Sequence, residues 1–176
     1  SRETAGLLCA AIISDTLLFQ SPTCTPMDEA TARTLAQIAG INIDEFAKEM
    51  FKAGSNLANK SVSEICFQDF KEFHVNELTF GVGQINSMSS EELQEIREKV
   101  CPELPDVLKE SGLDMVFFML TNIVDQSTEL LCCGGSARQT VIDAFELPED
   151  TDQIVLNGVV SRKKQLIPTL VSELQQ

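Results

Sequence analysis

The sequence predicts an α/β fold in which helices cover a mixed β-sheet, with a helical segment ahead of it. Two observations lead to this prediction. Beyond residue 60 the patterns follow the order β-β-α-β-β-α-β-α, which is typical of a sheet packed between helices. Before residue 54 the patterns are helical. The chain has 176 residues, of which 43% are hydrophobic, so it can bury a core in one domain or two small ones.

The first expected helix covers residues 4–19. Residues at helical spacing share one side of it, and the predicted buried stripe consists of Leu7, Ala11, Asp15 and Leu18. A carboxylate on such a stripe is costly unless it meets a cation, a metal ion or hydrogen-bond donors. Asp15 is therefore a candidate functional residue. The same sequence also fits a simpler alternative, in which Asp15 is exposed to solvent at the end of the helix.

The next two helices have clear start and stop signals. Thr25 is a predicted N-cap, with Pro26 in the first turn and Asp28 as its capping-box partner. This helix should end at Gly40, and a short one should cover residues 43–53 and end at the following glycine. The polar stretch at residues 54–64 then predicts a linker.

The remainder of the chain predicts the sheet and its helices. Strand-like runs at residues 65–73 and 77–85 suggest a hairpin with its turn near Asn76. The elements expected after it are an acidic helix capped by Ser89 or Ser90, a buried central strand at 114–123, a strand at 128–133, a helix at 137–145, a last strand at 153–160 and a last helix at 161–176.

Composition limits the classes of partner. The chain has 13 Lys and Arg against 27 Asp and Glu, a net charge of −14, which argues against a nucleic-acid or anionic-membrane surface. The apolar run at residues 5–13 is too short to span a bilayer. Six cysteines without CxxC spacing and a single histidine, His74, argue against a zinc cluster and fit a reduced, cytoplasmic protein.

Three adjacent cations stand out in this acidic chain. Ser161 is a predicted N-cap, so Arg162, Lys163 and Lys164 would occupy the first turn of the last helix. Cations are unfavourable there, because the helix dipole and the free N–H groups attract negative charge. A bound phosphate would reverse this effect. Neighbouring residues point about 100° apart, so we expect Arg162 and Lys163 to bind the anion and Lys164 to be solvated. A solvated helix start remains the simpler explanation.

Lys71 is another candidate for an anion contact. In the alternating run at residues 67–73 it shares one face with Phe67, Asp69 and Phe73. A lysine between phenylalanines either extends to the rim of the sheet or meets an anion.

Four segments resemble the C-terminal half of family II inorganic pyrophosphatases, which belong to the DHH phosphoesterase superfamily. They are AAIISDTLLFQSPTCTPMD at 10–28, DFKEF at 69–73, GQIN at 83–86 and SRKKQ at 161–165. The resemblance covers essentially the whole chain in the right order. It implies a helical end of the DHH domain at residues 1–56, followed by a DHH-associated, substrate-clamping domain at residues 57–176.

The resemblance also implies roles for single residues. Asp15 matches a metal ligand, Lys71 a phosphate contact, and Ser161, Arg162 and Lys163 the substrate clamp. The implied reaction is hydrolysis of pyrophosphate to two phosphates with Mn²⁺ or Co²⁺. The partners implied are pyrophosphate and phosphate, with a homodimer left open, while the acidic composition argues against contact with nucleic acid or membrane.

One departure from the family pattern matters. The family's other metal ligands are His and Asp residues of N-terminal motifs, including the DHH segment, and these 176 residues contain none of those motifs. We therefore expect a piece of a longer enzyme that is inactive alone and binds no metal stably. The alternatives are an exopolyphosphatase or another phosphoesterase of the superfamily, and a non-catalytic anion-binding or regulatory module.

Overall fold

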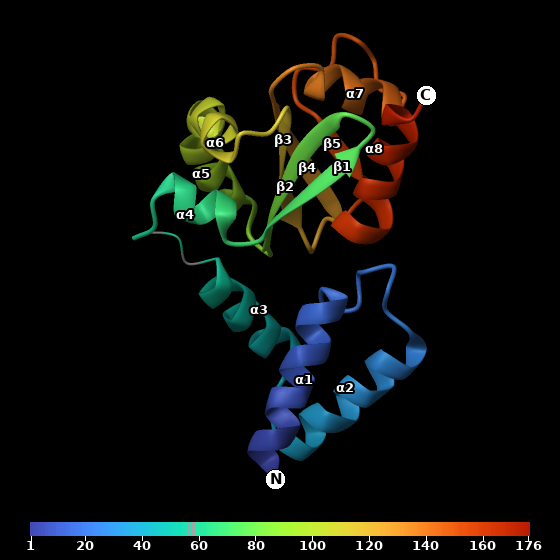
Figure 1. The fold of residues 1–176 in the computed structure, drawn as a ribbon. Helices are drawn as coiled ribbons and strands as arrows, with labels where there is room; N and C mark the ends of the chain where they lie inside the picture. Colours follow the sequence, from blue (N-terminus) through green and yellow to red (C-terminus); the bar gives the residue numbers. More distant parts are fainter. Residues whose placement is uncertain (56, 58) are drawn as a thin grey trace. The chain divides into compact units, whose positions relative to one another are not determined.

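The structure is a computed structural model that describes residues 1–55, 57 and 59–176. The chain divides into two compact units, residues 1–56 and 57–176 (Figure 1), and each is described by itself. The predicted linker at residues 54–64 includes positions 56 and 58, which lie outside the described residues.

The first unit is helical, as predicted. Its helices are α1 (Arg2–Thr16), α2 (Pro26–Ala39) and α3 (Ile43–Gly54). The Thr25 hydroxyl accepts a hydrogen bond from the Asp28 N–H group, and the Asp28 carboxylate accepts one from the Thr25 N–H group. Helix α2 ends at Gly40, where the backbone takes the left-handed conformation with φ 72°. The predicted capping box and glycine stop are therefore confirmed.

The prediction for the buried side of α1 is wrong. Its buried residues are Ala5, Cys9, Ile13 and Thr16. Leu7 is 73% exposed and Asp15 is exposed as well. Small residues explain the difference, because Ala5 and Cys9 allow α1 to approach α2 closely, and the Cys9 Sγ atom lies 3.4 Å from the Ala32 carbonyl oxygen. The helix also ends at Thr16, since the next three residues have positive φ angles.

The second unit contains a mixed sheet in which spatial order follows chain order, β1-β2-β3-β4-β5. Only the β2–β3 pair is parallel among these described neighbours. The strands are β1 (Phe70–Val75), β2 (Leu78–Ser87), β3 (Met115–Asn122), β4 (Ser127–Cys133) and β5 (Val155–Asn157). Every residue of β3 is buried, as the continuous apolar run predicts for a central strand.

Two predicted strands are shorter than expected. The first three residues of the run at 65–73 are helical, because they belong to α4 (Val62–Phe67), which begins with a capping box formed by Ser61 and Glu64. Only the part from Phe70 onward is extended. The last strand covers three residues, Val155–Asn157, rather than residues 153–160. Residues 158–161 are bound instead by side chains from elsewhere in the unit, as described below.

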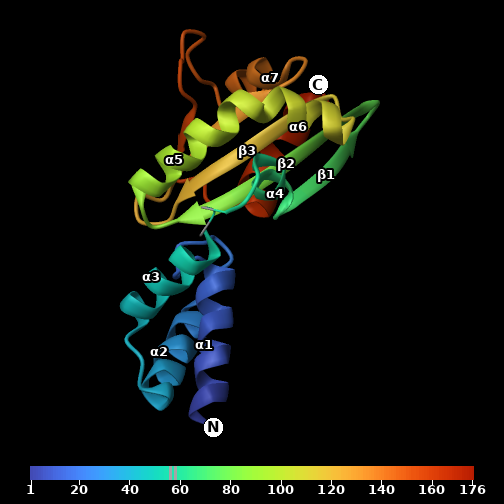
Figure 2. The same cartoon turned by 90° about the vertical axis from the view of Figure 1, so that its left-hand side faces the viewer.

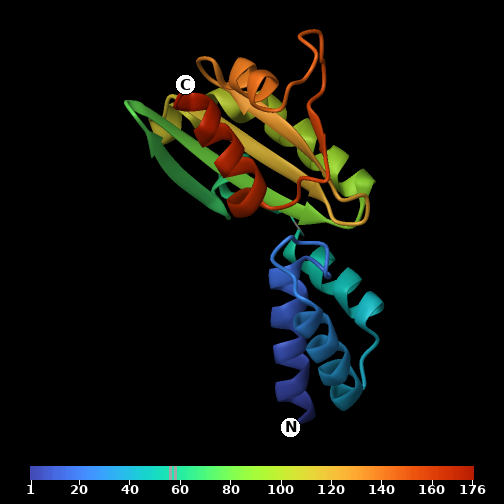
Figure 3. The same ribbon diagram turned by 90° about the vertical axis from the view of Figure 1, so that its right-hand side faces the viewer.

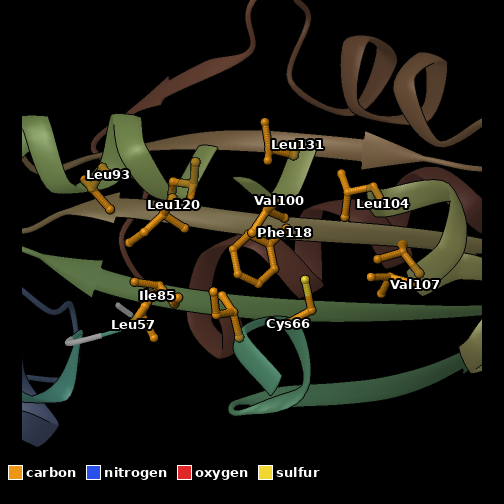
Figure 4. Close-up of a cluster of buried hydrophobic side chains, with 13 residues drawn as sticks. Leu57, Cys66, Ile85, Leu93, Val100, Leu104, Val107, Phe118, Leu120 and Leu131 are labelled. Atoms are coloured by element: carbon orange, nitrogen blue, oxygen red, sulfur yellow. The ribbon is translucent and has the colours of Figure 1, made fainter. Parts of the chain in front are cut away.

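Helices cover both faces of the sheet. Helices α4, α5 (Ser90–Val100) and α6 (Leu104–Ser111), with the short 3-10 helix η1 (Cys101–Glu103), lie on one face (Figure 2). Phe118 lies in the middle of the apolar cluster between these helices and the sheet (Figure 4). The opposite face carries α7 (Ala137–Ala144), the π-helical turn η2 (Arg162–Leu166) and α8 (Ile167–Leu174) (Figure 3).

Candidate anion-binding site

The last helix begins where the sequence predicts. The Ser161 Oγ atom accepts a hydrogen bond from the Lys164 N–H group over 3.2 Å, so Ser161 is the N-cap. The next residues form η2, in which the Leu166 N–H group donates to the Ser161 carbonyl oxygen over 3.2 Å. Such wide π-helical turns are rare and frequently occur at functional sites. The turn that carries the cations therefore has an unusual backbone.

The Arg162 side chain points inward. The residue is 8% exposed. Its Nη2 atom forms an ion pair with Asp69 Oδ1 over 2.7 Å, and its Nη1 atom donates to the carbonyl oxygens of Asp69 and Val82 over 2.8 and 3.0 Å. The guanidinium group thus joins η2 to the start of β1 and the middle of β2.

Lys71 lies close to the same strand position. It is opposite Val82 in the antiparallel β1–β2 pair, and directly opposed residues share a face of the sheet. That face is the one covered by α7, η2 and α8, because Val82 belongs to its apolar cluster. Lys71 is exposed. Lys71 and Arg162 are therefore both attached to the sheet around Val82. The expectation that Phe67 shares a strand face with Lys71 is wrong, because Phe67 belongs to helix α4.

Lys163 and Lys164 remain at the surface. Both are exposed, whereas the residue before them is buried. The prediction of a solvated Lys164 fits this exposure. The start of η2 thus combines one buried guanidinium group with exposed ammonium groups and a hydroxyl-capped helix start. Such a set of donors suits a small anion with several oxygen atoms, such as phosphate.

The segment before Ser161 is held by the side chain of Gln165. The Gln165 Oε1 atom accepts hydrogen bonds from the N–H groups of Val160 and Ser161 over 2.9 and 3.0 Å. Its Nε2 atom donates to the Gly158 carbonyl oxygen over 2.7 Å. The side chain of this one glutamine therefore binds three consecutive peptide groups of the irregular stretch before η2.

Side chains of two strands bind the same segment from the sheet, and a third strand links them. Gln84 Nε2 on β2 donates to the Val160 carbonyl oxygen over 3.1 Å, and Thr128 Oγ1 on β4 donates to the Val159 carbonyl oxygen over 2.6 Å. Thr121 on β3 lies between them. Sequence reasoning missed these residues. The available signal was a polar residue near the end of two expected strands, Gln84 in 77–85 and Thr121 in 114–123, and Thr128 at the start of the next.

Asp15 belongs to the first unit, where it is an exposed carboxylate near the end of α1. Across the part of the chain that the structure describes, no group of three or more His, Cys, Asp or Glu side chains is arranged to hold a metal ion. The residues present therefore do not make a dinuclear centre by themselves.

A cavity of about 260 Å³ lies elsewhere in the second unit, beside β4. Its lining includes Arg97, Glu129 and Arg138. Arg97 is already paired with Glu129 over 2.6 Å. Arg162 is likewise paired with Asp69, so the start of η2 is the stronger candidate only because it adds two exposed lysines, Lys163 and Lys164.

The fold and this site define an acidic α/β domain that presents cations at the start of its last helix. The sequence pattern of the DHHA2 domain matches residues 48–172. The chain therefore belongs to the DHHA2 domain family.

Curated relatives are inorganic pyrophosphatases. A cobalt-dependent inorganic pyrophosphatase from Clostridium perfringens is 45% identical over 170 residues, which are 97% of this chain and 31% of that protein. A manganese-dependent inorganic pyrophosphatase from Methanothrix thermoacetophila is 41% identical over 173 residues, which are 98% of this chain and 56% of that protein. The chain corresponds to the C-terminal part of these relatives.

A solved structure has the same fold. The crystal structure of a Methanococcus jannaschii protein assigned to the family II inorganic pyrophosphatases matches with a TM-score of 0.83 and 38% identity. The match covers 100% of this chain and 57% of that protein. The predicted α/β fold class and the resemblance to this family are thus confirmed, and the chain spans about half the length, or less, of these matches.

Proposed function

We propose that this chain is the phosphate-clamping part of a metal-dependent inorganic pyrophosphatase that hydrolyses pyrophosphate to two phosphates. The single observation that carries the proposal is the grouping of Lys71 and Arg162 around Val82, at the start of a helix capped by Ser161. The names of the relatives supply the substrate. Pyrophosphate carries the dense negative charge that such a cationic site suits.

The cations differ in what they contribute. Arg162 is oriented by Asp69 and by two carbonyl oxygens, so little side-chain freedom is lost when it meets an anion. Lys71 and Lys163 are exposed, and their ammonium groups are free to reach a bound anion. Donors that are already in place where charge develops on a leaving phosphate stabilise the transition state. Charge-assisted hydrogen bonds of this kind are worth about 1.5–3 kcal/mol each.

The metal is the part that this chain does not supply alone. Relatives are named manganese- or cobalt-dependent, and Mn²⁺ suits carboxylate oxygen ligands such as that of Asp15. We propose Asp15 as one ligand, with the rest contributed by residues beyond these 176. When bound, the metal ions would supply an activated water and neutralise phosphate charge. On this proposal, residues 1–56 are the end of a DHH metal-binding domain and residues 57–176 the DHH-associated domain.

The proposed setting is the cytoplasm, with pyrophosphate and phosphate as partners and neither nucleic acid nor membrane involved. The net charge of −14 supports the absence of nucleic-acid and membrane contacts, because nucleic acid and anionic membranes would repel such a surface. Among the described helices, none has the length and apolar character needed to cross a membrane.

Phosphate release tests the proposal. The full-length protein containing this chain should hydrolyse pyrophosphate in the presence of Mn²⁺ or Co²⁺, whereas residues 1–176 alone should release none. Comparing pyrophosphate with long-chain polyphosphate in the same assay separates a pyrophosphatase from an exopolyphosphatase. Metal-dependent turnover by the isolated chain would contradict the division of roles. A full-length protein that turns over neither substrate would favour a non-catalytic anion-binding module.

A further inference from the structure

Two threonine hydroxyl groups are buried where β3 and β4 meet their connecting turn, on a sheet face that is otherwise mostly apolar. Thr121 on β3 and Thr128 on β4 are both 0% exposed, and they lie opposite each other in the antiparallel β3–β4 pair. Their Oγ1 atoms are 2.8 Å apart. A buried hydroxyl group is costly unless it is hydrogen-bonded, so the partners of these two groups show what they do.

Counting protons fixes the direction of every hydrogen bond in this cluster. Thr128 donates its only hydroxyl proton to the Val159 carbonyl oxygen over 2.6 Å, so it must accept from Thr121. Thr121 then has no proton left and accepts from Gln84 Nε2 over 3.0 Å. The second Nε2 proton of Gln84 goes to the Val160 carbonyl oxygen over 3.1 Å. Each donor in the cluster therefore has one assigned acceptor.

The hydrogen bonds form a bracket around two consecutive peptide groups, whose carbonyl oxygens belong to Val159 and Val160. The path leads from the Val160 carbonyl oxygen through Gln84, Thr121 and Thr128 to the Val159 carbonyl oxygen. It spans β2, β3 and β4, and it binds the two residues that directly precede Ser161. No strand pairing holds these two residues, because β5 ends at Asn157.

We propose that Gln84, Thr121 and Thr128 are positioning residues for the anion-binding turn at Ser161, Arg162 and Lys163. The inference rests on the proposed function and names the residues that set the geometry of its site. Apolar side chains in the same space would pack against the sheet, but they could not orient the two carbonyl groups by hydrogen bonds. A satisfied polar network specifies one arrangement of the chain. A displacement of about 1 Å at a site that positions reacting groups can cost roughly a hundredfold in rate.

Thr128 offers a test by near-isosteric replacement in the full-length protein. Thr128→Val removes the hydroxyl group and keeps the shape, whereas Thr128→Ser keeps the hydroxyl group. We expect Thr128→Val to lower kcat/KM for pyrophosphate roughly tenfold to a hundredfold, with unchanged Mn²⁺ affinity. Thr128→Ser should restore most of the loss. Thr140→Val, at a threonine that is 6% exposed on α7, is the matched control and should keep the wild-type kcat/KM.

Backbone hydrogen exchange gives a second measurement that does not depend on activity. The N–H groups of Val160 and Ser161 should exchange several-fold faster in Thr128→Val than in wild type or Thr128→Ser, because the bracket around this segment is open. Wild-type exchange there in a folded Thr128→Val protein would overturn the inference. So would wild-type kinetics in that variant, or a failure of Thr128→Ser to restore them.

The two proposals fail in different ways. If the wild-type protein does not hydrolyse pyrophosphate, the proposed function is wrong, and the exchange measurement still decides whether the three side chains hold the turn. If the wild-type protein is active but Thr128→Val exchanges and reacts as wild type does, the positioning role alone is wrong.

Discussion

Arg162 Nη2 lies 2.7 Å from Asp69 Oδ1, which joins two residues that are 93 positions apart in the chain. The Arg162 side chain is 9% exposed and the Asp69 side chain is 51% exposed, so the ion pair extends from the interior to the surface. Arg162 thus has a structural role in addition to the proposed contact with substrate. Variants at this position should reveal both.

Arg162→Ala is expected to lower both stability and activity. The substitution leaves the carbonyl oxygens of Asp69 and Val82 without their donor, which costs about 1–3 kcal/mol in the free energy of unfolding. In the full-length protein, kcat/KM for pyrophosphate should fall by roughly one to two decades or more. Lys163→Ala should lower kcat/KM while leaving stability unchanged, because Lys163 is exposed. Chemical denaturation and phosphate release measure the two effects, and equal loss of stability in both variants would contradict the prediction.

Asp15→Asn is expected to act on the metal. The variant should weaken Mn²⁺ binding by the full-length protein roughly tenfold or more, and activity should fall as a consequence. Arg162→Ala should barely change the metal affinity. Asp125→Asn, at another exposed carboxylate, serves as the control. Calorimetric titration with Mn²⁺ separates the roles, and a loss of affinity in Arg162→Ala as large as that in Asp15→Asn would show that the partition is wrong.

Gly134→Ala is expected to destabilise the second unit more than Gly112→Ala. Both glycines have positive φ angles, 94° and 68°, so alanine is strained at either position by about 1 kcal/mol or more. A Cβ atom at Gly134 would also lie 2.5 Å from the Asp114 carbonyl oxygen, whereas one at Gly112 would meet no atom within 4 Å. The extra cost should be about 1–3 kcal/mol, measured by urea unfolding. Equal effects would show that the backbone at Gly134 moves away without cost.

Acid should weaken the contact between β2 and the loop before β3. The Thr79 N–H and hydroxyl groups donate to Asp114 Oδ2 over 2.7 and 2.9 Å, and these bonds lower the pKa of the Asp114 carboxyl group from its ordinary value of 3.8. A lowered pKa in the folded state gives stability that is fully present above pH 3.8 and is lost as the pH falls through the folded value. Asp114→Asn should therefore be less stable than wild type at pH 7, and the difference should shrink at lower pH. Thermal melts at several pH values check this, and a constant difference would contradict it.

Local signals predicted much of the fold. Thr25 with Asp28, Gly40 and Ser161 mark element boundaries through hydrogen bonds to residues a few positions away. Such bonds depend only on the adjacent sequence, which makes these boundaries predictable. The apolar run of β3 was recognised for the same reason, since a strand covered on both faces needs no alternation.

The errors concern contacts made over long distances in the chain. The buried side of α1 depends on how closely Ala5 and Cys9 approach α2, and a helical period of 3.6 fits more than one stripe. The candidate cations were identified by residue type and by resemblance. The inward direction of Arg162 was not, because it depends on Asp69 and Val82. The hydrogen bonds of Thr121 and Thr128 likewise depend on a distant part of the chain, because Thr128 binds the Val159 carbonyl oxygen in the segment that follows β5.

The strand order has a consequence for how the second unit assembles during synthesis. Because β1 to β5 lie in the order in which they are made, each strand can join the free edge left by the strand before it. Synthesis runs from the N-terminus, so β1 is made first and β5 last. Arg162, which follows β5, then contacts Asp69 at the opposite edge. The turn that carries Ser161, Arg162 and Lys163 is therefore completed only after all five described strands have been made.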